Sequence, residues 1–268
     1  MRFAFGKNWR SFLELLNENR IEESVRAVRT SLGRGDLIGC RVLDIGSGSG
    51  LSSLAMRRMG ARLVSFDFDT DSVACTRELR ERFFPNDPDW EIMQGSVLDE
   101  HFMTSLGTFD VVYAWGVLHH TGNMWRAIDL SLSRVGESGT FLVALYNDQG
   151  WRSRVWWHIK RVYCSSWLGR ATVVATFYPL FAAYALALDV RRGEMPGSHA
   201  RGYARQRGMS LTHDWKDWLG GYPFEVTSRR ELSGVVEPRG FALQRESLTR
   251  GWGCNEFVYA ADSTRHGE

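Results

Sequence analysis

The sequence predicts an α/β fold built on a largely parallel sheet, and three observations support this. Short apolar segments alternate with helical segments over the first half of the chain, which indicates right-handed β–α–β crossovers. A glycine-rich turn, GSGSG at 46–50, joins the first apolar segment to a helix. Two segments near the end, 240–246 and 254–260, flank a short glycine-containing connection that is typical of an antiparallel hairpin.

The alternation of apolar and polar residues predicts where each element of this sheet begins and ends. We expect strands at 40–45, 62–66, 90–93, 109–113 and 139–146, and helices at 51–59, 70–84, 123–135 and 228–238. A helical preface precedes the first strand, because Trp9, Phe12, Leu13 and Leu16 follow helical spacing and a second apolar face runs from residue 21 to residue 32.

Three regions follow from these elements. Residues 1–38 form the helical preface, and residues 39–146 together with 228–262 form the sheet domain. Residues 147–227 match no β–α unit, so we expect a helical insertion, or lid, over the carboxyl edge of the strands.

The composition of the chain disfavours several classes of function. Of 268 residues, 44% are hydrophobic, which is enough for a packed core. Lys and Arg number 33 against 31 Asp and Glu, so the clear basic excess of a general nucleic-acid binder is missing and that partner is disfavoured. The four cysteines are far apart and form no C-x-x-C pair, which disfavours a cysteine zinc site. The first residues contain no secretory signal pattern, so we expect a cytoplasmic protein.

The glycine turn and an acid beyond it predict a nucleoside-binding site. The spacing is G-x-G-x-G, whereas dinucleotide dehydrogenases use G-x-G-x-x-G. Asp67 ends the second strand, 17 residues beyond Gly50, where a carboxylate accepts hydrogen bonds from both hydroxyls of a ribose. The alternative role for Asp67 is a helix cap or a solvated turn residue.

The motifs VLDIGSGSG (42–50), VSFDFD (64–69) and FDVVYAWGVLHHTG (109–122), with the closing hairpin, resemble the class I S-adenosylmethionine-dependent methyltransferase family. The resemblance covers about residues 40–146 and 228–261. It implies a seven-stranded, doubly wound sheet in the order 3-2-1-4-5-7-6, with strand 7 antiparallel. It also implies S-adenosylmethionine as cofactor, S-adenosylhomocysteine (SAH) as product, and a cofactor lying across strands 1, 2 and 4.

The resemblance assigns cofactor contacts residue by residue. The methionine part would face the glycine loop, Asp67 would bind ribose, and Phe68 would pack on adenine. Many members carry an acid where this chain has Ser96, so the contact with the adenine amino group departs from the family here. The full expected set is Asp44, Gly46, Ser47, Gly48, Gly50, Asp67, Phe68, Ser96, Val97 and Trp115.

The fourth strand restricts the methyl acceptor. It ends in Ala114, Trp115, Gly116 and Val117, not in the Asn/Asp-Pro-Pro-aromatic motif of enzymes that methylate amino groups of nucleobases or glutamine. The acid that a metal-dependent catechol site needs at this edge is also missing, so we expect no metal. We therefore expect a small-molecule acceptor, methylated at oxygen. Two alternatives stay open: a thiol or sulfide acceptor, and a non-catalytic ligand sensor or partner subunit with the same fold.

Candidate catalytic residues lie in the turn after the fourth strand, at the end of the fifth, and in the insertion. A histidine in the first of these could remove a proton near neutral pH, since its ordinary pKa is about 6.5. The alternatives are a scaffolding turn, a polar loop, and insertion carboxylates paired with arginines. The expected set is His119, His120, Tyr146, Asp148, Asp214 and Asp217.

One segment of the insertion is unusually apolar. Residues 171–188 carry no charge, and arginines follow from Arg191 to Arg207. The segment predicts either a buried lid helix or oligomer contact, or a peripheral membrane contact through 171–207. The oligomeric state is left open by the sequence.

Overall fold

The computed structural model describes residues 9, 13, 16–198, 211–249 and 251–262. Its centre is one seven-stranded sheet in the order β3-β2-β1-β4-β5-β7-β6, in which β7 runs antiparallel to both of its neighbours. The predicted order and the antiparallel last strand are therefore confirmed. The strands are β1 Arg41–Ile45, β2 Arg62–Asp67, β3 Trp90–Gln94, β4 Phe109–Trp115, β5 Val135–Tyr146, β6 Phe241–Ser247 and β7 Cys254–Ala261.

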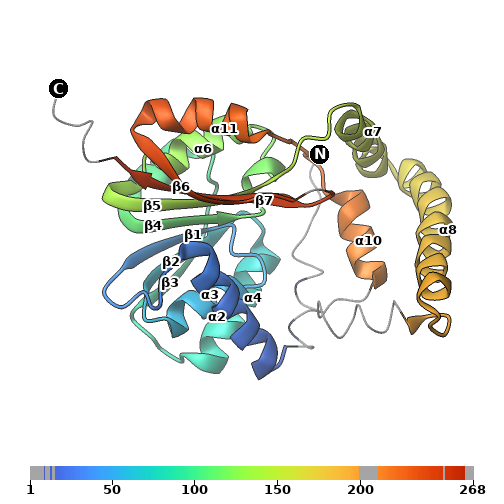
Figure 1. The fold of residues 1–268 in the computed structure, drawn as a ribbon. Coiled ribbons are helices and arrows are strands. Elements are labelled where there is room, and N and C mark those ends of the chain that lie inside the picture. The colour runs from blue at the N-terminus through green and yellow to red at the C-terminus, as the bar shows by residue number, and fades with distance from the viewer. Residues whose placement is uncertain (1–8, 10–12, 14–15, 199–210, 250, 263–268) are drawn as a thin grey trace.

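Helices cover both faces of this sheet (Figure 1). One face packs on α2 (Glu18–Leu32), α3 (Leu51–Arg58) and α4 (Thr70–Phe83). The other packs on α5 (Glu100–Ser105), α6 (Met124–Leu132) and α11 (Arg229–Val236). Because both faces are covered, the central strands are buried over most of their length, which explains their largely apolar sequences.

Several boundaries differ from the sequence prediction. The predicted helix 123–135 ends at Leu132, and β5 begins at Val135 instead of 139, because Val135 pairs with Phe109 before a shift in register. The short helix α5 was not predicted, although Asp99 caps it by accepting a hydrogen bond from the Phe102 N–H. With only six residues, α5 is too short to show helical periodicity.

The insertion leaves and re-enters the sheet domain at one place, where Asn147 and Thr227 form a parallel bridge. It contains α7 (Trp151–Ser165), α8 (Trp167–Arg192) and α10 (Leu211–Gly220). Figure 1 shows α10 between the sheet and α8, with α8 as the outermost helix beyond the carboxyl edge of the strands.

Lys160 fastens α7 to the end of α10. Its side chain is fully buried, and its ammonium donates a hydrogen bond to the carbonyl of Trp218, in the last turn of α10. The last carbonyls of a helix lack partners within the helix and carry partial negative charge, so a cation there is favourable. Cys164 binds the carbonyl of Gly220 in the same way, at 3.1 Å. Two side chains of α7 therefore cap α10.

Aromatic rings surround the same ammonium. Nζ of Lys160 lies 4.3 Å from the ring centre of Trp218, 4.9 Å from that of Phe224 and 6.0 Å from that of Tyr146. Ring faces attract cations, and the attraction is stronger away from water. These contacts offset part of the cost of burying a charge.

The structure contradicts the buried-helix alternative for α8. Val173 and Asp189 are its buried residues, and only 6% of its most apolar 18-residue window is buried. Among the described residues, α8 is the one helix long and apolar enough to cross a membrane. Residues 199–207 of the predicted contact region lie outside the described residues.

Replacing Lys160 by alanine should lower the free energy of unfolding by about 2–4 kcal/mol, because it opens a cavity and leaves the Trp218 carbonyl without its donor. Urea unfolding followed by circular dichroism measures this loss. Arg154→Ala, an exposed position on the same helix, is the matched control and should change the stability by less than about 0.5 kcal/mol. Equal effects of the two substitutions would show that the cap contributes nothing.

Candidate functional site

The glycine loop between β1 and α3 adopts backbone conformations that favour glycine. Gly46, Gly48 and Gly50 have φ of 73°, 56° and 80°. Space excludes side chains as well: a Cβ on Gly46 would lie 2.3 Å from Cγ2 of Val117, and one on Gly50 would lie 2.7 Å from Cα of Thr76. Glycine is therefore required at these positions for both conformational and steric reasons.

Asp67 holds this loop from the end of β2. Its Oδ2 accepts a hydrogen bond from the Gly48 N–H at 3.0 Å, and its Oδ1 accepts one from the Asp69 N–H at 2.8 Å. The N–H groups of Gly46 and Ser47 both donate to the Phe66 carbonyl, at 2.8 and 3.0 Å. The loop is thus fixed against β2, with a carboxylate at its rim.

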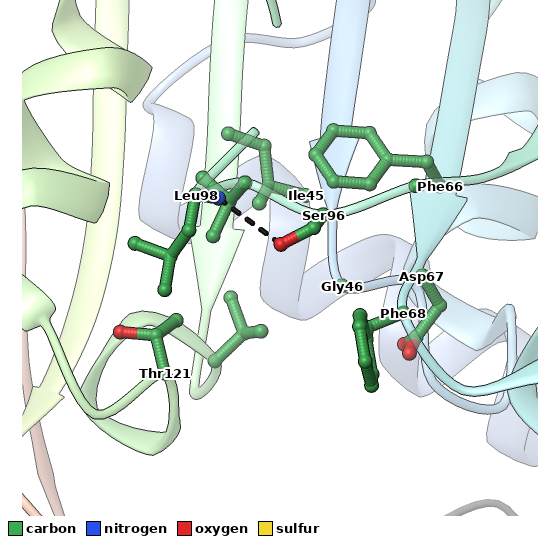
Figure 2. Close-up of a pocket in the computed structure, with 11 residues that line it drawn as sticks. Ile45, Gly46, Phe66, Asp67, Phe68, Ser96, Leu98 and Thr121 are labelled. Atoms are coloured by element: carbon green, nitrogen blue, oxygen red, sulfur yellow. Dashed lines mark hydrogen bonds between the residues drawn. The ribbon is translucent and has the colours of Figure 1, made fainter. Parts of the chain in front are cut away.

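A small pocket, open to solvent, lies beside Asp67. Figure 2 shows Phe68 next to Asp67 on one side and Thr121 on the opposite side. The Phe68 ring is unusually accessible for an aromatic side chain, with 53% of the residue exposed. The lining residues are Ile45, Gly46, Phe66, Asp67, Phe68, Gly95, Ser96, Val97, Leu98, Val117 and Thr121.

Five of the predicted cofactor residues line this pocket: Gly46, Asp67, Phe68, Ser96 and Val97. Where many family members have an acid, the Ser96 hydroxyl accepts a hydrogen bond from the Leu98 N–H at 3.2 Å.

Asp44 lies beneath the loop, outside the pocket lining. It ends a buried polar chain that links four elements. The Trp90 indole donates to Ser65 at 3.1 Å, Ser65 donates to Ser53 at 3.0 Å, and Ser53 donates to the Asp44 carboxylate. Burial raises the pKa of Asp44 to about 7, although the bond from Ser53 opposes the shift.

The remaining predicted cofactor residues have other partners. The Ser47 hydroxyl is buried 2.9 Å from the Thr76 hydroxyl. Trp115 is 47% exposed and donates to Glu256 Oε1 at 2.9 Å, while the Ser31 hydroxyl on α2 donates to Oε2 of the same carboxylate at 2.7 Å. Trp115 is therefore tied to β7 and α2, at a point outside the lining of the described pocket.

Trp9 reaches the loop from the N-terminal preface, and the sequence analysis missed this contact. A Cβ on Gly48 would lie 3.3 Å from the Trp9 indole nitrogen. The spacing of Trp9 predicted only a helical face. Nothing local in the sequence indicates which part of the domain that face covers.

The turn after β4 has two sides. It contains the 3₁₀ helix η1 (Leu118–His120). Val117 and Thr121 face the pocket, whereas His119 and His120 are buried. The His119 ring lies 4.0 Å from the Tyr146 ring, and His120 Nδ1 donates to the Pro223 carbonyl at 2.7 Å.

His119 is held neutral. Burial lowers its pKa well below the ordinary value, and the neighbouring His120 and Lys160 lower it further. Its Nδ1 has no hydrogen-bond partner among the described residues. An uncharged, fully buried imidazole acts here as a packed ring of the turn.

Residues 223–227 clamp this turn. The Glu225 N–H donates to the His119 carbonyl at 3.0 Å. The Glu225 carboxylate accepts from the N–H groups of Gly122 and Met124 at 3.0–3.2 Å, which places a negative charge at the start of α6. The Thr227 N–H donates to the Tyr146 carbonyl at 3.1 Å. The HHTG and YPFE motifs, about 100 residues apart, thus dock on each other.

Aromatic rings extend from this clamp into the insertion. Tyr146 contacts Phe224 and Trp218, with ring centres 5.2 and 5.8 Å apart. Trp218, Trp156 and Trp252 form a mutual trio, each pair 5.4–5.6 Å apart. The three tryptophan rings and Tyr146 therefore form an apolar aromatic cluster at the carboxyl end of β5.

The other predicted catalytic residues stand apart from this cluster. Asp148 is exposed, and its carboxylate accepts from the Gly150 N–H at 2.8 Å in a turn. The side chains of Asp214 and Asp217 lie outside the described residues. Both stay predictions.

Comparison with known proteins agrees with this geometry. The family model described as a methyltransferase domain matches residues 5–191, well over half of the chain. The chain belongs to this methyltransferase family. Its sheet order and glycine loop are those of the class I S-adenosylmethionine-dependent members.

Individual relatives of this methyltransferase are distant. It is 29% identical over 111 residues, 41% of its length, to the ubiquinone biosynthesis O-methyltransferase of Glaesserella parasuis serovar 5 (strain SH0165). The match spans about half of that relative, 47%.

Two solved structures share its fold. A magnesium protoporphyrin IX methyltransferase from Synechocystis PCC 6803 with bound SAH aligns over 92% of this chain and 89% of its own, with a TM-score of 0.54 and 15% identity. An O-methyltransferase family protein from Burkholderia thailandensis aligns over 92% and 58%, with a TM-score of 0.56 and 15% identity.

The pH dependence of stability tests the buried carboxyl of the methyltransferase. Because the pKa of Asp44 is raised from an unfolded value of about 4 to about 7, the folded state binds more protons between these values. Stability from this group is complete below about pH 4 and falls as the pH rises toward 7, by at most about 4 kcal/mol.

Asp44→Asn removes the charge and keeps the shape. The variant should therefore gain stability relative to the natural protein at pH 8 but not at pH 4.5, as measured by urea unfolding across this range. Asp148→Asn, at an exposed position, serves as the control. A stability difference between the Asp44 variant and the natural protein that stays constant with pH would contradict the raised pKa.

Proposed function

We propose that this methyltransferase binds S-adenosylmethionine in the pocket beside Asp67 and transfers its methyl group to a small-molecule acceptor, at oxygen. One observation carries the proposal: a glycine loop without room for side chains, a carboxylate and an exposed aromatic ring meet at one pocket, at the carboxyl edge of β1 and β2. Open α/β sheets bind their ligands at this edge.

The residues present suit an adenosyl group. The Asp67 carboxylate offers acceptors to ribose hydroxyls, and the Phe68 ring, at the rim of the pocket, suits stacking on adenine. The glycine loop offers backbone and not side chains to a methionine moiety. When bound, S-adenosylmethionine supplies an electrophilic methyl group on a sulfonium cation.

An oxygen acceptor is supported by the partial match to an O-methyltransferase, and we take His120, in the turn after β4, as the candidate base. A hydroxyl acceptor must lose its proton during transfer. Because His120 donates through Nδ1 to the Pro223 carbonyl, Nε2 is the nitrogen that carries no hydrogen in the neutral ring. His119 is less suited, since it is fully buried and its environment disfavours the protonated form.

Isothermal titration with SAH tests the cofactor site. Asp67→Ala should weaken binding roughly 10- to 100-fold, the value of a lost charge-assisted hydrogen bond. Glu91→Ala, which removes an exposed carboxylate on the neighbouring strand β3, should bind SAH like the natural protein. A folded natural protein, free of co-purified ligand, that binds neither SAH nor S-adenosylmethionine would overturn the proposal and favour a ligand sensor or partner subunit.

Methyl transfer from labelled cofactor to a panel of phenols, alcohols and thiols tests the acceptor and the base. His120→Asn keeps a donor for the Pro223 carbonyl and removes Nε2, so kcat on a hydroxyl acceptor should fall about 100-fold or more while SAH affinity is unchanged. His120→Gln removes the hydrogen bond to the Pro223 carbonyl, so comparing its stability and kcat with those of His120→Asn separates an effect on folding from an effect on catalysis. Turnover of thiols alone would replace the oxygen acceptor by sulfur, and an unchanged kcat in His120→Asn would place the base elsewhere.

A further inference from the structure

The outer face of α8 is apolar and uncovered. Five residues spaced three or four apart lie on one side of the helix and are exposed: Leu180, Ala183, Tyr184, Ala187 and Val190. Leu180 is 58% exposed and Tyr184 is 67% exposed. A contiguous apolar surface of this kind on a soluble domain marks a site of contact with a partner or a membrane.

The inner face of the same helix is already used. Val173, Phe177 and Phe181 pack with residues of α7 and α10, and the rings of Phe181 and Trp215 lie 5.4 Å apart. α8 thus has a packed side and an open side, unlike a core helix, which is buried all round. Its 26 residues, about 39 Å at 1.5 Å per residue, are attached lengthwise to the domain.

The charged residues of α8 lie near its two ends. Arg170 stands near its start and Arg191 and Arg192 at its end, all exposed. Its one acidic residue, Asp189, is 1% exposed and accepts a hydrogen bond from the Gly197 N–H at 2.7 Å, so it is turned away from the open face. Arg170 lies over the ring of Tyr163 on α7, 5.3 Å from its centre, whereas Arg191 and Arg192 stand at the end of the apolar stripe. Within α8 no acid is exposed, and the exposed Glu194 follows the helix.

Helix α7, which packs against α8, also carries exposed positive charge. Arg152, Arg154 and Arg161 are exposed on it, interleaved with the exposed apolar residues Val155 and Val162. Exposed guanidinium groups on the helix next to α8 disfavour insertion of α7 and α8 into a hydrocarbon core. They suit a layer of anionic headgroups.

We propose that α8 lies in the plane of an anionic lipid bilayer, with its outer face in the interfacial region and the flanking arginines on lipid headgroups. Apolar burial supplies the attachment and the arginines supply preference for negative charge. The contact is peripheral, and the sheet domain with its pocket stays in water on one side of the membrane.

Sedimentation of the full chain with vesicles tests this surface. The natural protein should bind vesicles of an equal mixture of phosphatidylcholine and phosphatidylglycerol, and bind phosphatidylcholine alone more weakly. The double variant Leu180→Glu, Tyr184→Glu should lose roughly tenfold or more in affinity, because each carboxylate would enter the interface. Ile38→Glu, an equally exposed apolar position at the amino edge of the sheet, should bind like the natural protein.

Two controls keep the outcome decisive. Circular dichroism must show that the double variant folds, and Arg191→Gln with Arg192→Gln should weaken binding to the mixed vesicles while leaving the weak binding to phosphatidylcholine unchanged. Failure of the natural protein to bind either vesicle overturns the proposal. A concentration-dependent dimer in analytical ultracentrifugation that the double variant abolishes, without vesicle binding, would instead assign the face to a second copy of the chain.

Discussion

The close contact between Gly46 and Val117 is the constraint on which the site depends. Because Gly46 has no Cβ, the turn after β4 packs directly on the loop after β1, and two crossover connections share one wall of the pocket. Any larger residue at 46 would separate them, since the space is occupied by Val117. The position of the β4 turn is thereby tied to the loop that would hold the cofactor.

The same turn is the attachment point of the insertion. Glu225 and Pro223 bind its backbone and His120, and Thr227 binds the end of β5. Lys160 then joins α10 to α7, and α7 carries α8. Pocket, turn, clamp and outer helix therefore form one continuous series of contacts.

Local sequence was sufficient for the strands, whereas their order in the sheet was implied by the family resemblance. The strands, the glycine loop and the closing hairpin are specified by neighbours in the chain, and Asp67 was placed by its distance from Gly50. The contacts of residues 223–227 with the turn after β4 could not be predicted from the sequence. Glu225 caps α6 from about 100 residues away and lies in no helical or strand pattern of its own. The burial of Lys160 was likewise invisible, since lysine is ordinarily exposed and its cage comes from three separate segments. In α8, both faces of the apolar segment lack charged residues, so the sequence did not indicate which face is exposed.

The place of the insertion in the chain affects how the protein is made. β5 pairs with β7 along Thr140–Tyr146, yet about 110 residues separate Tyr146 from Cys254. At roughly 5–20 residues per second, synthesis leaves this apolar strand edge without its partner for on the order of 5–20 seconds. An unpaired edge is a template for association with other chains. During this interval the nascent chain carries an apolar strand edge that β7 covers only when synthesis is nearly finished.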